Sequence, residues 1–426
     1  MTTTPQPSDA PAPGATLDAP TRDLLLDITS TPTAAGKEQR VIAKIEAWLR
    51  GRPGLVRRDD AHGNIEIALD PDAGAPFREG PPVYFTAHMD HPAFVVERVV
   101  GPATIELAFR GGVMDDYFPD ARVVLHLRGG DGARTTVGGV ITGRGDLTTP
   151  DKSWMCDLDE QTDSVQVGDF ATWELPPAEI VEEVLAGDNP TGERGAVLYT
   201  NACDDLAALV AALVALDRLR EKRGAGERVH DTRVLLTRAE EIGFIGAIGA
   251  SRDGFMPRGA RIIALENSRS FEDSPIGGGP IVRVGDRVSV FSPGLTGAVA
   301  KVAERIAGGP ASVRANQKLS ELPTWRWQRK LMAGGACEAS VFCHFGYEAT
   351  CVCLPLGNYH NMANLTEAQA GTHEGPPRVG REHVAVRDFL GMVDLLVGCG
   401  EDLPGTGGLG DRLEKLWADR SGVLRG

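Results

Sequence analysis

The sequence lacks any long apolar run. No stretch of its 426 residues approaches the roughly 20 apolar residues that a membrane-spanning helix requires. The first residues also lack the basic and apolar regions of a signal peptide. Basic residues are in the minority, since 44 Lys and Arg stand against 59 Asp and Glu and give a net charge of −15. This balance excludes nucleic acid and an anionic membrane surface as expected partners, and the cytoplasm is the expected location.

Cysteine is scarce as well. The 7 cysteines are an odd number scattered through a long chain, which excludes the disulfide framework of a small secreted domain. A hydrophobic content of 42% with 24% charged residues is ordinary for a globular protein. The length is sufficient for one large α/β domain with a smaller one.

The composition and the hydrophobic pattern change several times along the chain. Residues 1–20 are rich in Pro, Thr and Ala, and we expect them to be disordered. Residues 21–94 and 196–400 alternate apolar strands with helical patterns and predict one α/β domain. Residues 95–195 carry short alternating β segments between Gly and Asp turns, which predict an inserted small β-barrel domain. Residues 401–426 form a Gly-rich tail with one short helical pattern.

Within the α/β domain, residues 82–86 form an apolar run without polar alternation, as in a central strand covered on both faces. Residues 206–220 are apolar nearly all round, which predicts a buried helix. The other predicted strands are 55–58, 64–69, 196–199, 234–236, 261–265 and 350–354, and the other predicted helices are 21–31, 38–50, 294–307 and 382–397.

Two adjacent acids, Glu240 and Glu241, follow the predicted strand 234–236 and precede a Gly/Ala-rich helical pattern. Adjacent carboxylates at the exit of a buried strand can divide their labour, one holding a metal and the other moving a proton. The alternative is that both decorate the first turn of a helix, where the helix dipole favours acidic residues. The pair alone leaves both interpretations open.

The residues that could decide between these two interpretations lie elsewhere in the chain. Metal-ligand side chains follow five of the predicted apolar strands: His88, Asp204, Glu241, Glu266 and His360. Strand ends converge at one edge of an open α/β sheet. Carboxylates and imidazoles suit zinc, cobalt or manganese. The three carboxylates and one hydroxide would together balance the charge of two divalent cations, which favours a dinuclear site.

Six short motifs carry a family resemblance. In chain order they read HMDHPAF (88–94), ACDD (202–205), RAEEIGFIGA (238–247), ALEN (264–267), GGACEA (334–339) and PLGNYHN (355–361). Together they resemble the glutamyl aminopeptidase or tetrahedral aminopeptidase family of dinuclear metallo-aminopeptidases. The long insertion between His88 and Asp204 is also placed as in the tetrahedral aminopeptidases. The resemblance implies a mixed sheet sandwiched by helices, with the inserted barrel pairing subunits into a homo-oligomer.

The resemblance also implies a ligand set. Asp204 would bridge two divalent ions, for which zinc is the first expectation and cobalt or manganese the alternatives. His88 and Glu266 would complete one site, and Glu241 and His360 the other.

Further roles follow from the same resemblance. Asp90 would orient His88, and Glu240 would be the general base that takes a proton from water and passes it to the leaving amine. The chain departs from the family at His91, where a Glu is usual, so His91 could perturb or add to the first site. DDL replaces DDR and GNYHN replaces a motif with Arg before the final His, which leaves the substrate side chain open.

Three functions remain open at this point. The first is a dinuclear metal-dependent aminopeptidase acting on peptides. The second is an amidohydrolase or deacylase of small N-acyl metabolites on the same scaffold. The third is a silent metal-binding oligomeric homologue, against which the presence of Glu240 and all five ligand residues argues.

Overall fold

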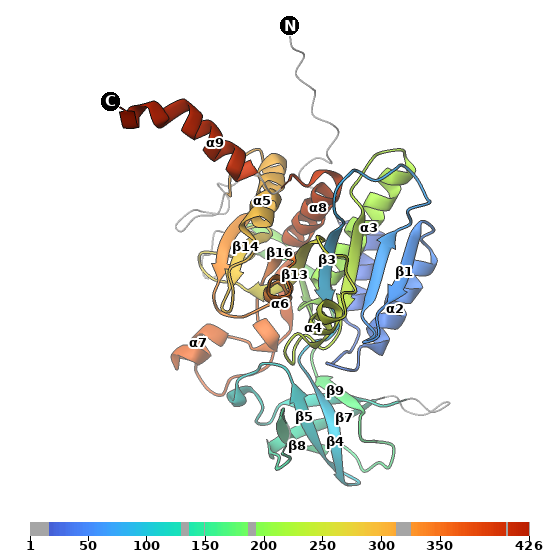
Figure 1. Cartoon of the computed structure of the whole chain (residues 1–426). Coiled ribbons are helices and arrows are strands. Elements are labelled where there is room, and N and C mark those ends of the chain that lie inside the picture. Colours follow the sequence, from blue (N-terminus) through green and yellow to red (C-terminus); the bar gives the residue numbers. More distant parts are fainter. Residues whose placement is uncertain are drawn as a thin grey trace.

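The computed structural model describes residues 17–128, 136–148, 150–185, 193–311, 325–405 and 408–425. An α/β body carries a closed β-barrel at one end (Figure 1). Among the described residues, no helix is long and apolar enough to cross a membrane. The large sheet and the closed barrel confirm the predicted fold class, a mixed sheet sandwiched by helices with an inserted β-barrel.

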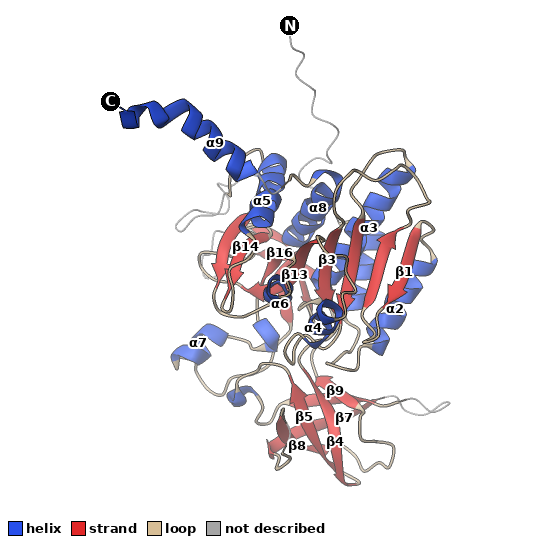
Figure 2. Cartoon of the chain, in the orientation of Figure 1, coloured by secondary structure: helices blue, strands red, loops and turns tan. Residues whose placement is uncertain are grey.

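Eight of the described strands form the sheet of the body (Figure 2). Their order across the sheet is β1 (Leu55–Asp59), β2 (Ile65–Leu69), β12 (Thr232–Thr237), β3 (Val83–His88), β13 (Arg261–Arg269), β16 (Glu348–Leu356), β14 (Ile281–Asp286) and β15 (Gln328–Met332). The four central strands β12, β3, β13 and β16 are parallel to one another. The pairs β1–β2, β2–β12 and β14–β16 at the two sides of the sheet are antiparallel. Every residue of β3 is buried, as its unbroken apolar run predicted.

Helices cover both faces of this sheet. One core cluster joins the sheet to α1 (Ala19–Thr29), α2 (Gln39–Arg50), α3 (Leu206–Gly224), α5 (Pro293–Ala307) and α8 (Val386–Asp402). On the opposite face lie the short helices α4 (Ile245–Arg252) and α6 (Glu338–His344), seen in front of the sheet in Figure 1. Strand β3 divides its side chains accordingly, because Phe85 joins the first core and Tyr84 the second.

The barrel closes in the order β4 (Ala93–Gly101), β5 (Thr104–Arg110), β8 (Lys152–Leu158), β7 (Thr136–Arg144), β6 (Arg122–His126) and β9 (Phe170–Trp173). Its interior is aromatic: the ring of Phe118 stacks on Trp154 with centroids 4.0 Å apart, and Phe94 meets Trp173 edge-on at 4.7 Å. This aromatic core is separate from the cores that flank the large sheet. The barrel therefore has a core of its own.

Two expectations differ from the structure at the edges of these parts. The barrel strands cover 93–173, whereas the insertion was expected at 95–195. Strand β10 (Glu179–Val184) pairs instead with β11 (Arg194–Thr200), which also pairs with β17 (Glu382–Ala385). The helix expected at 382–397 was wrong at its start, because residues 382–385 pair with β11 and α8 begins only at Val386. A non-local strand partner here overrides the local helical pattern.

The two ends of the chain are also partly described. The expected disorder of residues 1–20 lies largely outside the described residues, and α1 begins at Ala19. At the other end, α7 (Leu365–Ala370) lies near the barrel, and α9 (Gly408–Arg420) extends away from the body in Figure 1. The tail thus contains the predicted short helix.

Candidate metal centre

The sequence-predicted ligands converge, although not all from the same sheet. His88 ends β3, Glu241 follows β12, and Glu266 lies within β13 rather than beyond its end. His360 follows β16 in a short 3₁₀ turn (Tyr359–Asn361). Asp204 follows β11, which belongs to the small three-stranded sheet and not to the main one. The expectation of a single sheet edge was wrong for Asp204, which instead reaches the centre from the turn that leads into α3.

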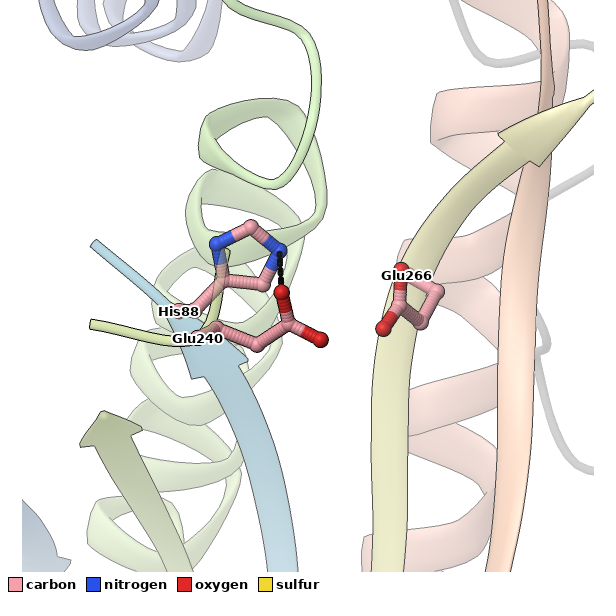
Figure 3. Close-up of side chains that lie close together, drawn as sticks. All are labelled: His88, Glu240 and Glu266. Carbon is pink, nitrogen blue, oxygen red and sulfur yellow. Dashed lines mark ion pairs between the residues drawn. The ribbon is translucent and has the colours of Figure 1, made fainter. Parts of the chain in front are cut away.

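Two groups of ligand atoms result. The first contains His88, Glu240 and Glu266, whose ligand atoms all lie within 4.8 Å of one another. Figure 3 shows the His88 ring beside the Glu240 carboxylate, with Glu266 facing them from β13. The second group contains Asp204, Glu241 and His360 within the same limit.

Asp204 connects the two groups. Its Oδ1 lies 3.4 Å from Nε2 of His88, and its Oδ2 lies 3.5 Å from Nε2 of His360. Glu241 lies on the His360 side, with its Oε1 3.5 Å from the same Nε2. The Asp204 carboxylate therefore faces both groups, one oxygen to each.

Both histidines present the same ring nitrogen to the centre. Nδ1 of His88 lies 3.0 Å from the main-chain oxygen of Asp90, and Nδ1 of His360 lies 2.7 Å from that of Gly112. A carbonyl oxygen only accepts, so each Nδ1 carries the proton and each Nε2 keeps a lone pair directed at the carboxylates. Gly112 lies between β5 and β6, so the inserted barrel region helps to orient His360.

Asp90 acts on the paired glutamates more directly than on His88. Its two carboxylate oxygens accept the main-chain N–H groups of Glu240 and Glu241 at 2.9 and 3.0 Å. The same carboxylate lies 3.6 Å from Nδ1 of His88, which is too long for a hydrogen bond. Asp90 therefore holds the backbone of the pair, an arrangement not predicted from the sequence.

The carboxylates of the centre lack protein partners for their charge. Oδ1 of Asp204, Oε1 of Glu241 and Oε1 of Glu266 are buried without a hydrogen bond. Burial raises the pKa of Glu240, Glu241 and Glu266, and the neighbouring negative charges raise it further. Burial opposes ionisation of Asp204 too, but the neighbouring His360 and His88 rings outweigh burial and lower the pKa of Asp204. Orphaned acceptors and mutual repulsion are what bound cations relieve, so this donor set fits divalent metal ions.

His91 was expected to perturb or add to the first site. The structure turns its ring away from both groups of ligand atoms: Nδ1 faces the main-chain oxygen of Asp204, and Nε2 lies 3.0 Å from Oδ1 of Asn361. Burial lowers the pKa of His91 to about 4. His91 thus supports the backbone of Asp204.

Glu382 is a residue that the sequence reasoning missed. One of its oxygens accepts the N–H groups of Cys203 and Asp204 at 2.7 and 3.0 Å, and the other accepts that of His360 at 2.8 Å. A single buried carboxylate therefore holds the backbones of two expected ligands. No local signal marks Glu382, because its partners come from distant segments.

We expect Glu382→Gln to weaken divalent-ion binding by about 10- to 100-fold, because the introduced amide N–H groups would face donors and loosen Asp204 and His360. Titration of the metal-free variant with Co²⁺ or Zn²⁺ measures the change. Glu348→Gln, at the start of β16 and far from the centre, is the matched control. Unchanged affinity in Glu382→Gln would contradict a positioning role for Glu382.

A cavity of about 150 Å³ adjoins the centre. Its wall includes Glu266, Arg283, Phe271, Met332 and Tyr359. The Tyr359 ring stacks on His360, with centroids 3.8 Å apart. A group bound in this cavity would therefore lie directly beside the candidate metal ligands.

Comparisons with known proteins show the family of the chain. The model of the M42 glutamyl aminopeptidase family matches residues 74–307, more than half of the chain. No curated protein matches the chain by sequence.

Solved structures resemble the whole fold. A TET aminopeptidase from a marine sediment archaeon of the Thaumarchaeota has a TM-score of 0.65 and 16% identity, covering 90% of this chain and 97% of its own. The TET1 peptidase of Pyrococcus horikoshii, which can assemble into a tetrahedron or an octahedral shell, has a TM-score of 0.65 and 18% identity, covering 90% and 100%. An aminopeptidase from Desulfurococcus kamchatkensis has a TM-score of 0.65 and 18% identity, covering 90% and 94%.

Proposed function

The chain belongs to the M42 glutamyl aminopeptidase family and is an aminopeptidase, as its motifs predicted, and on this basis we propose that it releases N-terminal residues with the help of two divalent cations. One observation carries the proposal: the Asp204 carboxylate directs one oxygen to the His88 side and the other to the His360 side. A carboxylate shared between two ligand groups can bind two neighbouring cations at once, as suits a dinuclear centre.

The ligand assignment follows from that position. His88 and Glu266, together with Oδ1 of Asp204, would hold one cation, and Glu241 and His360, together with Oδ2 of Asp204, the other. The orphaned oxygens of Asp204, Glu241 and Glu266 support this division. When bound, such cations would polarise the scissile carbonyl and lower the pKa of water toward about 7. Zinc is the ion that we propose, because it accepts mixed imidazole and carboxylate ligands.

Glu240 is the group that we propose to move the proton. Its Oε2 lies 4.0 Å from Nε2 of His88, within the first ligand group, and Asp90 fixes its main chain. Burial raises the pKa of Glu240, which suits a carboxylate that must accept a proton and then release it. Oε2 of Glu240 would take the proton of the attacking water and deliver it to the leaving amine nitrogen.

A homo-oligomer acting in the cytoplasm belongs to the same proposal. One of the similar solved structures is described as a dodecamer, and the Pyrococcus horikoshii TET1 peptidase as a tetrahedron or octahedral shell. The barrel has an aromatic core of its own, so it can keep its shape while its outer face contacts another subunit.

Substrates with and without a free amine test the proposed activity. We expect the purified protein to release aniline from aminoacyl anilides and to leave the N-acetylated forms intact, because an aminopeptidase requires the free N-terminus. Cleavage of the N-acetylated substrates alone would favour the deacylase alternative. No turnover of either series by the metal-loaded protein would favour a silent homologue.

A further inference from the structure

The turn at residues 238–241, which carries the paired glutamates, is held by side chains from other segments of the chain. Its four consecutive main-chain N–H groups each donate a hydrogen bond to a side-chain oxygen. Asn64 accepts the first at 3.0 Å, Glu38 accepts the second at 3.1 Å, and Asp90 accepts the last two. All three acceptor side chains are buried. These side chains therefore fix the path of the backbone through the turn.

The second residue of this turn, Ala239, has an unusual backbone conformation. Its φ is +52°, in the left-handed region that residues with a Cβ rarely adopt. Such a conformation persists only where the surrounding structure holds it. The main-chain oxygen of Ala239 accepts the N–H of Ile245 at 3.1 Å, and its N–H donates to Oε1 of Glu38. Directly after this bend, Glu240 joins the first ligand group and Glu241 the second, so the bend decides where both carboxylates lie.

Glu38 is itself held rigidly in place. It immediately precedes α2, and none of its surface is exposed. Besides Ala239, its Oε1 accepts the N–H of Gly36 at 2.7 Å, and its Oε2 accepts Nε of Arg238 at 2.9 Å. A buried carboxylate with donors on both oxygens is fixed in position. Glu38 belongs to neither group of ligand atoms, so any effect on the reaction must pass through the turn.

The simpler explanation is that Glu38 only stabilises the fold, as a buried acid paired with an arginine. Glu66, on β2, is such a residue, with an exposed fraction of 3%. It accepts hydrogen bonds from Arg58 at 2.8 Å and from the hydroxyl of Tyr84 at 2.6 Å, and neither partner lies in the turn. A comparison of the two acids therefore separates support of the fold from support of the turn.

We propose that Glu38 is a positioning residue for the reaction, because by holding Ala239 in the left-handed conformation it sets the position of the Glu240 carboxylate. The inference rests on the proposed function, in which Glu240 moves the proton. A displacement of a reacting group by about 1 Å can lower a rate by about 100-fold. Loss of the hydrogen bond between Glu38 and Ala239 should therefore lower kcat far more than it weakens substrate binding.

Glu38→Gln tests this inference in the full-length protein. The amide has only one oxygen, so it cannot accept hydrogen bonds from both Ala239 and Arg238. We expect kcat for an aminoacyl anilide, measured at a saturating concentration of metal ion, to fall about 30-fold while KM stays within about threefold of wild type. Glu66→Gln is the matched control, which should lower the melting temperature by a similar amount but keep kcat within about twofold of wild type.

Ala239→Gly supplies a rescue that a purely structural role would not show. Glycine adopts the left-handed region without the penalty of a Cβ, so the bend no longer depends on Glu38. In the background of Ala239→Gly, the further change Glu38→Gln should lower kcat by only about threefold, instead of about 30-fold. A loss of equal size in both backgrounds would show that Glu38 does not act through the conformation of Ala239, and would overturn the inference.

Hydrogen–deuterium exchange of the full-length protein, measured by mass spectrometry, gives a readout that is independent of turnover. Glu38→Gln should speed exchange in a peptide spanning residues 238–244 by about tenfold and leave peptides from β2 unchanged. Unchanged exchange, or faster exchange with unchanged kcat, would overturn the inference and leave the aminopeptidase function standing. Failure of the wild type to cleave any aminoacyl anilide would instead remove the proposed function, and the role of Glu38 with it.

Discussion

Glu240→Gln is expected to lower kcat by about 10³-fold while the protein keeps both cations. The glutamine side chain matches glutamate in size and can remain beside His88, but it cannot accept a proton. General acid–base catalysis contributes about 10²- to 10⁴-fold to enzymatic rates, so its loss should dominate the kinetics. Turnover of an aminoacyl anilide and metal content by mass spectrometry, measured on the same preparation, check the two parts.

The neighbouring Glu241 supplies the matched comparison. Both glutamates receive the same backbone support from Asp90, so the two substitutions differ mainly in the side chain that is changed. Glu241→Gln should lose the cation of the His360 side as well as activity. Normal turnover in Glu240→Gln would exclude Glu240 as the base, and loss of metal from that variant would make it a ligand, as its place in the first ligand group allows.

Asp204→Asn should reduce the metal content from two ions per chain toward none and lower activity by more than about 10³-fold. The amide keeps the shape of the side chain, but only one oxygen remains to face two groups of ligands, and the negative charge between them is lost. Metal binding stabilises the folded state by mass action. Chelation should therefore lower the melting temperature of the wild type and leave that of Asp204→Asn almost unchanged.

Asp217→Asn is the control for this experiment. Asp217 lies in α3, the helix that follows Asp204, and pairs with Arg52 and Arg220 away from the centre. This variant should bind two ions and respond to chelation as the wild type does. Full metal content in Asp204→Asn would mean that the carboxylate is not shared between two cations.

Much of this centre was accessible from the sequence, because its ligands follow strands that local pattern reveals. His88 ends β3, which the apolar run before it predicts. Glu241 follows β12, the parallel neighbour of β3 in the sheet. Glu266 lies on the neighbouring central strand β13, so its position beside His88 follows from sheet pairing. Parallel strands bring such residues to one edge without any further information.

The rest depends on contacts between distant segments. Glu382 was read as the first residue of a helix, yet its pairing with Thr200 in the small sheet places its carboxylate under Asp204 and His360. The support of the turn that carries Glu240 and Glu241 could not be predicted either, because buried Glu38 accepts the N–H of Ala239 at 3.1 Å across 201 positions of sequence. The spacing of residues along the chain does not predict such hydrogen bonds.

Arg283 was also not singled out. No strand was predicted over Ile281–Asp286, the segment that contains Arg283. The register of β14 against β16 places it opposite Cys351 and buries it at the cavity beside Glu266. Its burial is a property of the assembled sheet and could not be read from local pattern.

The account as a whole depends on two cations bound by two groups of side chains that share Asp204. Calorimetric titration of the metal-free wild-type protein with Co²⁺ or Zn²⁺ tests this directly. We expect two binding sites per chain, and His360→Ala should leave only the site of His88 and Glu266. A single site in the wild type, or no site, would contradict the dinuclear centre.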